Sequence, residues 1–125
     1  MLVRTIMKQK ALELSDEMLD AIAQRFRLLG EPARLRLLRI LETGEHGVNQ
    51  LTEKVGGNQA NVSRHLTAMY NAGVLKRRRE GTSVYYTIAD PTIFQLCKLM
   101  CSSAQEVVRM QLSALSPPPR TRGRR

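Results

Sequence analysis

Two cysteines stand four residues apart, at Cys97 and Cys101, in a stretch whose apolar residues recur at helical spacing. Side chains at positions i and i+4 lie on the same face of a helix, about 6 Å apart. That distance is too wide for an easy disulfide within one unperturbed helix. It suits two thiolates on one soft metal ion, or on trivalent arsenic with a third ligand from elsewhere. Thiol oxidation, persulfidation or a disulfide between subunits is the alternative, and plain packing of small apolar side chains stays open beside both.

A second group of polar side chains begins a helix predicted to run from about Gln59 to Asn71. Glutamine and asparagine can pair with adenine, arginine with guanine, and a small alanine can meet the methyl group of thymine. The predicted base-reading residues are therefore Gln59, Ala60, Asn61 and Arg64. Ser63 and the N-cap residue Asn58 are expected to hold phosphates near the positive helix end. A solvated helix face is the alternative interpretation.

The next residues change to a strand pattern, with strands expected over 74–79 and 83–88 and a turn between them. Four cations follow one another in the first strand, from Lys76 to Arg79. Alternation along a strand sends only some of them to one face. A hairpin tipped with cations suits a phosphate backbone or a narrow minor groove. The predicted contacts on this hairpin are Arg77, Arg79, Gly81 and Thr82.

The elements that must position these residues are mostly helices. Ser15 is a good N-cap for a helix that Gly30 stops, and Pro32 begins a second helix expected to end at Gly44. A short helix over 48–56 and a glycine turn then precede the helix from Gln59, which is the helix-turn-helix pattern. With the hairpin that follows, the sequence predicts a mainly α fold with a small β-hairpin, a winged helix-turn-helix.

A last helix is expected from the N-cap Asp90 to about Leu115, with Pro91 at its first position. Its apolar residues cover more than one face, and such a helix must be buried nearly all round. The rest of the chain is too small to cover it. We therefore expect a homodimer that packs through its terminal helices, chiefly this one, with the first helix assisting. The apolar residues of the last helix include Ile93, Phe94, Leu96, Leu99, Met100, Ala104, Val107, Val108, Met110 and Leu112.

The length of 125 residues fits one domain, and the net charge of +9 suggests a polyanionic partner. Three tyrosines, two phenylalanines and no tryptophan argue against stacking on single-stranded bases. No apolar window is long enough for a membrane span, and the N-terminus lacks a signal-peptide pattern. We expect a cytoplasmic protein with an N-terminal arm over 1–14, a winged-helix DNA-binding and dimerisation domain over 15–115, and a disordered basic tail over 116–125.

In five ordered segments, the sequence resembles the ArsR/SmtB family of bacterial metal- and stress-responsive repressors. Residues 29–38, LGEPARLRLL, resemble its L-x-[DE]-P-x-R-L-x-I-L signature, and residues 62–66, VSRHL, resemble its V-S-x-H-L. Residues 72–75, 79–81 and 84–86 resemble its A-G-L-V, R-x-G and V-Y-Y. The resemblance covers about residues 16–112 and implies a homodimeric winged-helix repressor. Such a repressor releases a palindromic double-stranded DNA operator when an inducer binds.

The inducer site departs from the family pattern. Arsenic, cadmium and lead sensors of the family carry E-L-C-V-C-D-L, whereas residues 45–51 here read EHGVNQL, with Gly47 and Asn49 at the cysteine positions. The classical thiolate site is therefore expected to be absent. No cofactor is required, and a soft metal or metalloid such as As(III), Cd or Zn at Cys97 and Cys101 remains a candidate inducer.

The zinc sensors of the family use Asp and His from one last helix with His and Glu from the other. Asp90 and Glu106 suit the acidic positions, but Thr92 and Ser103 stand at the histidine positions. Two carboxylates without imidazoles make a poor zinc site. This site, too, is expected to be absent.

An enzyme is the least favoured class, because no Gly-rich phosphate loop, HExxH, CxxC or nucleophile with a plausible base is present. The two histidines have other expected roles: His65 turns inward to hydrogen-bond across the helix-turn-helix, and His46 is a loop residue. Two binding alternatives remain open. One is a sequence-tolerant architectural or RNA-binding protein, and the other is a winged helix whose thiols only pack.

Overall fold

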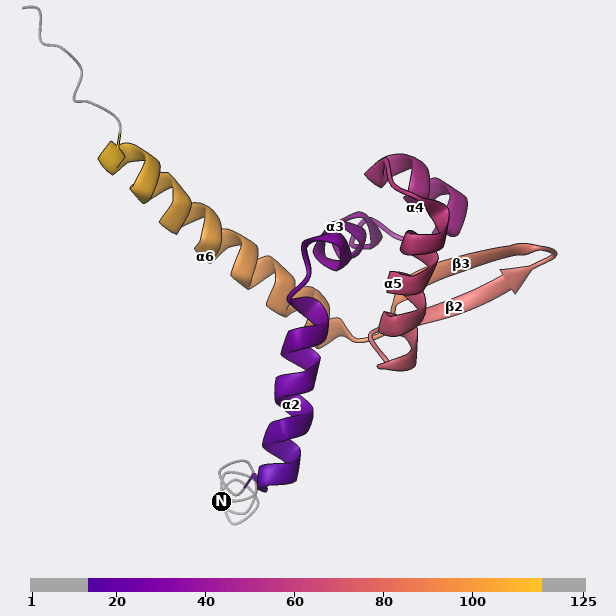
Figure 1. The fold of residues 1–125 in the computed structure, drawn as a ribbon, viewed down its shortest axis with the longest axis horizontal. Coiled ribbons are helices and arrows are strands. Elements are labelled where there is room, and N and C mark those ends of the chain that lie inside the picture. The colour runs from indigo at the N-terminus through magenta and orange to yellow at the C-terminus, as the bar shows by residue number, and fades with distance from the viewer. Residues whose placement is uncertain (1–13, 116–125) are drawn as a thin grey trace, which may run out of the picture. The chain divides into compact units, whose positions relative to one another are not determined.

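The computed structural model describes residues 14–115. The elements follow one another as two helices, a two-residue strand, two more helices, a hairpin and a last helix (Figure 1). They form two compact units, divided between Ala89 and Asp90. The expected domain over 15–115 thus spans both units. The expected tail over 116–125 and, apart from Leu14, the expected arm over 1–14 lie outside the described residues.

The helices begin and end where local chemistry favours it. Helix α2 (Asp16–Leu29) begins after Ser15, whose hydroxyl accepts from the Met18 amide at 3.1 Å. Helix α3 (Pro32–Leu41) has proline at its first position and ends three residues before Gly44, earlier than the sequence suggested, because residues 42–44 form a turn. Helix α4 (Val48–Val55) ends at Gly56, whose φ of 68° is the left-handed conformation that glycine adopts at low cost.

Helix α5 (Gln59–Asn71) has the predicted bounds and begins after the cap Asn58. Together α4, the glycine turn and α5 make the helix-turn-helix. Leucine and methionine side chains of α3, α4 and α5 meet in a core that is closed on one side by the hairpin. Its buried members are Leu29, Leu37, Leu38, Leu41, Leu51, Val62, Leu66, Met69, Val74, Leu75 and Tyr86.

The hairpin consists of β2 (Leu75–Glu80) and β3 (Ser83–Ile88), paired antiparallel from Leu75 opposite Ile88 to Glu80 opposite Ser83. Gly81 at its tip has a φ of 61°. A two-residue strand, β1 (His46–Gly47), adds to the other edge of β3, so the sheet order is β1-β3-β2. His46 is therefore a strand residue rather than the expected loop residue, and a two-residue strand is too short to leave a pattern in the sequence.

Helix α6 (Pro91–Leu115) has the predicted start and end. The Asp90 side chain caps it by accepting from the Thr92 amide at 2.9 Å. Ile93 is the buried residue of this helix, whereas Leu99 is 70% exposed and Met110 is 64% exposed. No helix within residues 14–115 combines the length and apolar character that crossing a bilayer requires.

Candidate nucleic-acid interface

The first turns of α5 present a largely polar edge. Gln59, Ala60, Asn61 and Arg64 are exposed, and Ser63 is half-buried. The Asn58 side-chain oxygen accepts from the Ala60 amide at 2.7 Å, so it is used locally and its amide nitrogen is the group left to donate to an anion. The core residues Val62, Leu66 and Met69 fix the opposite side of the helix. The predicted reading residues therefore share one outward surface on a rigid element.

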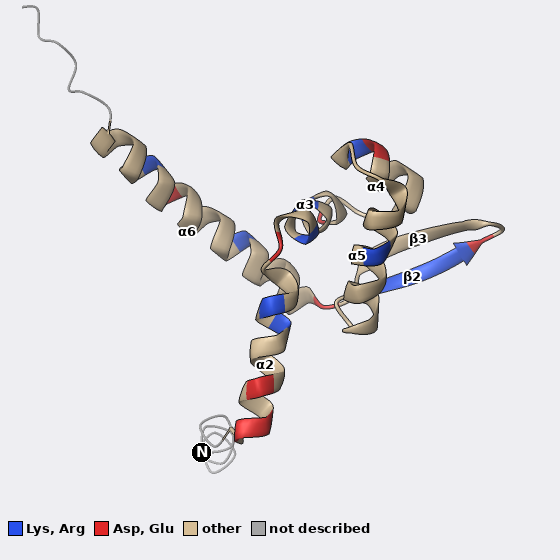
Figure 2. Cartoon of the chain, viewed as in Figure 1, with Lys and Arg blue, Asp and Glu red and all other residues tan. Residues whose placement is uncertain are grey.

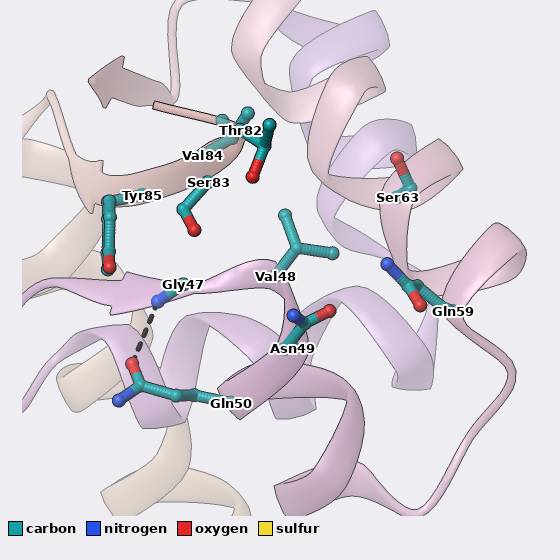
Figure 3. A pocket seen from close by; sticks show the side chains of 10 residues that line it. All are labelled: Gly47, Val48, Asn49, Gln50, Gln59, Ser63, Thr82, Ser83, Val84 and Tyr85. Carbon is teal, nitrogen blue, oxygen red and sulfur yellow. Dashed lines mark hydrogen bonds between the residues drawn. The ribbon is translucent and has the colours of Figure 1, made fainter. Parts of the chain in front are cut away.

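A groove of about 380 Å³ separates this edge from the hairpin (Figure 3). Figure 3 shows Gln59 and Ser63 on one side and Thr82 to Tyr85 on the other. The first turn of α4 closes the third side, and there the Gln50 side-chain oxygen accepts from the Gly47 amide at 2.9 Å. The side chains that line the groove include amides and hydroxyls, and none of them is charged. The lining residues are Gly47, Val48, Asn49, Gln50, Gln59, Ser63, Thr82, Ser83, Val84 and Tyr85.

Strand β2 carries the cations of the hairpin, as Figure 2 shows, and they do not behave alike. Arg77 lies with its guanidinium carbon 4.0 Å from the centre of the Tyr70 ring. Arg79 is exposed and shares a strand face with Arg77, in keeping with the alternation that selected both. Lys76 is exposed on the other face. Arg77 and Arg79 thus lie on the face of β2 that is directed toward α5.

Arg78 is already engaged within the protein. Its Nη2 and Nε donate to the two carboxylate oxygens of Glu45 at 2.7 and 3.2 Å, and its Nη1 donates to Glu80 at 2.8 Å. Its guanidinium carbon also lies 4.8 Å from the centre of the Tyr85 ring. The hydrogen bond from Arg78 lowers the pKa of Glu45, and the bonds to Glu45 and then Glu80 raise the pKa of Arg78. Its positive charge is therefore balanced locally by two carboxylates.

The groove brings together three predicted contact residues, Gln59, Ser63 and Thr82, from two separate elements. It adds Asn49 and Ser83, which the sequence reasoning missed. Ser83 follows the hairpin tip directly, which was an available signal. Asn49 lies in the first turn of α4, and only the packing of α4 against α5 and β3 places it here.

The thiols lie apart from this surface in the sequence, on α6. Cys97 is half-buried, Cys101 is exposed, and neither forms a disulfide. Within the described part of the chain, no three or more His, Cys, Asp and Glu side chains gather as a metal site would need. Glu106 is bonded to Arg109 at 2.6 and 2.8 Å.

Gly47 stands where the arsenic, cadmium and lead sensors of the family have the first cysteine of their motif. A Cβ atom at Gly47 would come within 3.3 Å of Tyr85 Cε1, so any side chain there requires the tyrosine ring to shift by a few tenths of an ångström. The close packing of β1 on β3 thus favours glycine where the sensors have cysteine.

A helix-turn-helix, a cationic hairpin and a polar groove between them define a winged-helix protein of the DNA-binding transcription-regulator class. The family model described as "Bacterial regulatory protein, arsR family" matches residues 31–77. A probable mercury resistance operon repressor from Streptomyces lividans is 31% identical over 99 residues, covering 78% of this chain and 79% of that protein. The chain therefore belongs to the ArsR family.

Solved structures agree with this assignment. The homodimeric winged helix-turn-helix DNA-binding domain from Mycobacterium bovis is 33% identical with a TM-score of 0.67, over 74% of this chain and 89% of that one. The AntR antimony-specific transcriptional repressor is 26% identical with a TM-score of 0.70, over 78% of this chain and 88% of that one. The predicted fold and family are confirmed, and the family's members are regulators rather than enzymes.

Proposed function

We propose that this chain is a homodimeric repressor that binds a palindromic DNA operator and releases it when an inducer acts at the cysteines of α6. The observation that carries the DNA-binding part is the polar edge of α5 lying beside a cationic hairpin across an uncharged polar groove. The relative described as a probable mercury resistance operon repressor supports repression as the outcome. A protein that binds the chromosome acts in the bacterial cytoplasm.

In this proposal the N-terminal half of α5 enters the major groove, which admits a helix. Gln59, Ala60, Asn61 and Arg64 reach base edges, while Asn58 and Ser63 hold phosphates. The sugar-phosphate backbone passes through the groove between α5 and the hairpin, where neutral amides and hydroxyls can donate to it.

The hairpin then reaches the neighbouring backbone or minor groove with the charged residues Arg77 and Arg79. Gly81 lets the turn at the tip close tightly, and the exposed Thr82 beside it offers a hydroxyl donor. Arg78 is not part of this set, because its donors are directed to Glu45 and Glu80.

The second copy of the chain covers α6. Phe94, Cys101, Val108 and Leu115 repeat at intervals of seven residues, with Cys97 and Ala104 between them. These six residues form the seam of α6, because their spacing is the one by which two helices pair. The polar residues Gln95, Lys98, Ser102, Glu106, Arg109 and Ser113 recur on a separate face. Pairing through the seam lets two reading helices meet successive turns of the duplex, about 34 Å apart.

Selection of duplexes from a random pool by the wild-type chain tests the DNA-binding part. An inverted repeat should emerge and should compete far better than a scrambled duplex of equal length at moderate salt. Asn61→Ala and Arg64→Ala should relax the preference at particular base pairs by a factor of about 10 to 100 each. Equal binding of selected and scrambled duplexes would instead identify an architectural protein.

The inducer part of the proposal rests on the seam. Cys97 and Cys101 stand within it, so pairing two α6 helices brings up to four thiols together and supplies the further ligand that one chain lacks. Thiolates prefer soft ions, so As(III), Cd and Zn are the candidates. The mercury and antimony repressors among its relatives support this chemistry. A disulfide between subunits, formed as two thiols lose two electrons and two protons to an oxidant, is the alternative, with persulfidation beside it.

The test is release of the selected duplex by wild type and by the Cys97→Ser/Cys101→Ser double variant. Each is titrated with arsenite, cadmium, zinc, an oxidant and a persulfide donor. Wild type should release DNA with at least one of them, and the double variant with none. Ala104→Ser is the matched control, because it alters the same seam and keeps both thiols. Identical responses of wild type and double variant would show that the thiols only pack.

A further inference from the structure

Arg34, at the start of α3, hydrogen-bonds to two other helices. Its Nη1 donates to the Leu28 carbonyl at 2.9 Å, and its Nε donates to His65 Nδ1 at 3.2 Å. The Glu31 carboxylate lies 3.7 Å from Arg34 Nε and 3.6 Å from His65 Nδ1. One guanidinium therefore joins the end of α2 and the middle of α5, although the two partners lie 37 positions apart in the sequence.

These bonds are shielded from water. The Arg34 side chain is 17% exposed and that of His65 is 12% exposed. The Leu28 carbonyl is among the last four of α2, which have no partner within their own helix. Arginine is donor-only, so the bond requires His65 Nδ1 to act as an acceptor. In the neutral ring, the proton then resides on Nε2.

We propose that the Arg34–His65 bond sets the rotation of α5 about its own axis and is thereby a positioning device for base reading. The inference rests on the proposed function, because it concerns how accurately the DNA-reading helix is held. Arg34 lies outside the reading edge of α5 and acts through His65, so it is a positioning residue.

The Arg34–His65 bond restrains the rotation of α5 in a directional way that its apolar contacts do not. Val62, Leu66 and Met69 hold the helix against the core, but hydrophobic contact has no directionality. A hydrogen bond does, and His65 directly follows the reading residue Arg64. At a side-chain radius of about 5–6 Å, turning the helix by 10° moves a reading group by about 1 Å, enough to spoil a bidentate base contact.

The same bond ties α5 to α2. Any displacement of the end of α2 acts on the Leu28 carbonyl and hence on the guanidinium that orients His65. The two family-like segments, 29–38 and 62–66, thus bond to each other through Arg34 and His65. Their pairing gives a physical reason for an arginine in one and a histidine in the other.

The experiment compares affinity for the wild-type-selected duplex with affinity for a scrambled duplex of the same length. Arg34→Met should reduce this ratio about tenfold, because the bonds of a charged donor are lost. Its affinity for the scrambled duplex should stay near the wild-type value. Arg36→Met is the matched control, since Arg36 is exposed on the same helix and loses the same charge, and its ratio should stay within about twofold.

Two substitutions of His65 separate positioning from stability. His65→Asn keeps an acceptor near the Nδ1 position, whereas His65→Leu removes it. Leucine has the higher helix propensity. If only stability mattered, His65→Leu would be the better protein. The proposal expects the reverse order for the affinity ratio, with His65→Asn above His65→Leu, while thermal unfolding ranks them the other way.

The outcomes are distinguishable. A wild type that selects no sequence overturns the proposed function and this inference together. A wild type that discriminates, with Arg34→Met or His65→Leu discriminating equally well, overturns this inference alone. If Arg34→Met does not fold by circular dichroism, the order of the two His65 variants decides the matter.

Discussion

The winged-helix core, built from α3, α4, α5 and the hairpin, and helix α6 use their apolar side chains in opposite ways, whereas α2 leaves Met18 and Phe26 about half exposed. In the first unit, leucines from three helices are almost completely buried, with Leu51 and Leu66 at 0% exposure. In α6, the large apolar residues from Leu99 onward are at least half exposed, and Leu115 reaches 81%. What separates the two regions is whether one copy of the chain can cover the apolar surface.

This contrast indicates that the two regions have different roles. A unit that closes its own core can leave a polar edge, a groove and a cationic hairpin open to a polyanion. A helix with uncovered apolar faces is incomplete until another surface meets it. The polar edge, groove and hairpin of the first region therefore suit recognition, whereas the uncovered apolar faces of α6, where the cysteines stand, suit assembly.

The largest expected effect comes from the closed core. Leu66→Ala should lower the free energy of unfolding by about 2–5 kcal/mol, because it opens a cavity among fully buried side chains. The loss, measured by chemical denaturation, should be the same at low and high protein concentration. Val108→Ala, on the α6 seam, should matter only through association, so its effect should depend on concentration. Two concentration-independent losses of equal size would remove the contrast between the regions.

The next prediction concerns the seam on α6. Val108→Glu places a charge on the seven-residue repeat and should raise the dimer dissociation constant about a hundredfold, measured by sedimentation. Ser113→Glu adds the same charge on the polar face of the helix and should leave association nearly unchanged. Equal weakening by both substitutions would mean that net charge, rather than the seam, governs association.

Within the hairpin, adjacent arginines should differ in their contribution to the salt dependence of DNA affinity. Arg79→Met and Arg77→Met should each reduce the slope of log affinity against log salt by about 0.9, because each removes a phosphate contact. Arg78→Met should change the slope far less, since that charge is balanced by Glu45 and Glu80. Fluorescence anisotropy across a salt series distinguishes them, and three equal slope changes would contradict the assignment of Arg78.

The smallest expected effect is the pH dependence of the Arg78–Glu45 contact. Arg78 lowers the pKa of Glu45 from its ordinary value of 4.5. A carboxyl with a depressed folded-state pKa stabilises the fold above its unfolded pKa, and the contribution is lost as the pH falls through the folded value. Acidification below about pH 4.5 should therefore lower the Tm of Glu45→Gln slightly less than that of wild type. The difference is small because the pair is exposed to solvent.

Much of the architecture was readable from local signals. Ser15, Asn58 and Asp90 cap the helices that they were expected to cap. Glycine, proline and the change from helical to strand spacing at residue 74 predicted where the helices and strands begin and end, with errors of one to three residues. The exposed polar edge of α5 was also predictable, because polar residues lead a helix whose apolar residues face inward. These features depend on neighbours in the sequence.

The relationships between distant residues were not predictable in this way. The run from Lys76 to Arg79 looks uniform, and only the fold brings Glu45 to Arg78. Asn49 joins the groove because α4 packs against α5 and the sheet. The inward turn of His65 was expected, but no local pattern indicated that Arg34, 31 positions earlier, is its partner.

The sequence alone determined the helix-turn-helix, the hairpin, the basic character and the uncovered apolar helix, because capping, periodicity and charge act over a few residues. Tertiary structure decided which cation is already paired, which polar groups line the groove, and which arginine hydrogen-bonds to α5. Those outcomes depend on distances of a few ångströms between segments that lie 30 or more residues apart in the sequence. Hydrogen bonds and ion pairs weaken over a few ångströms, so local sequence patterns do not reveal them.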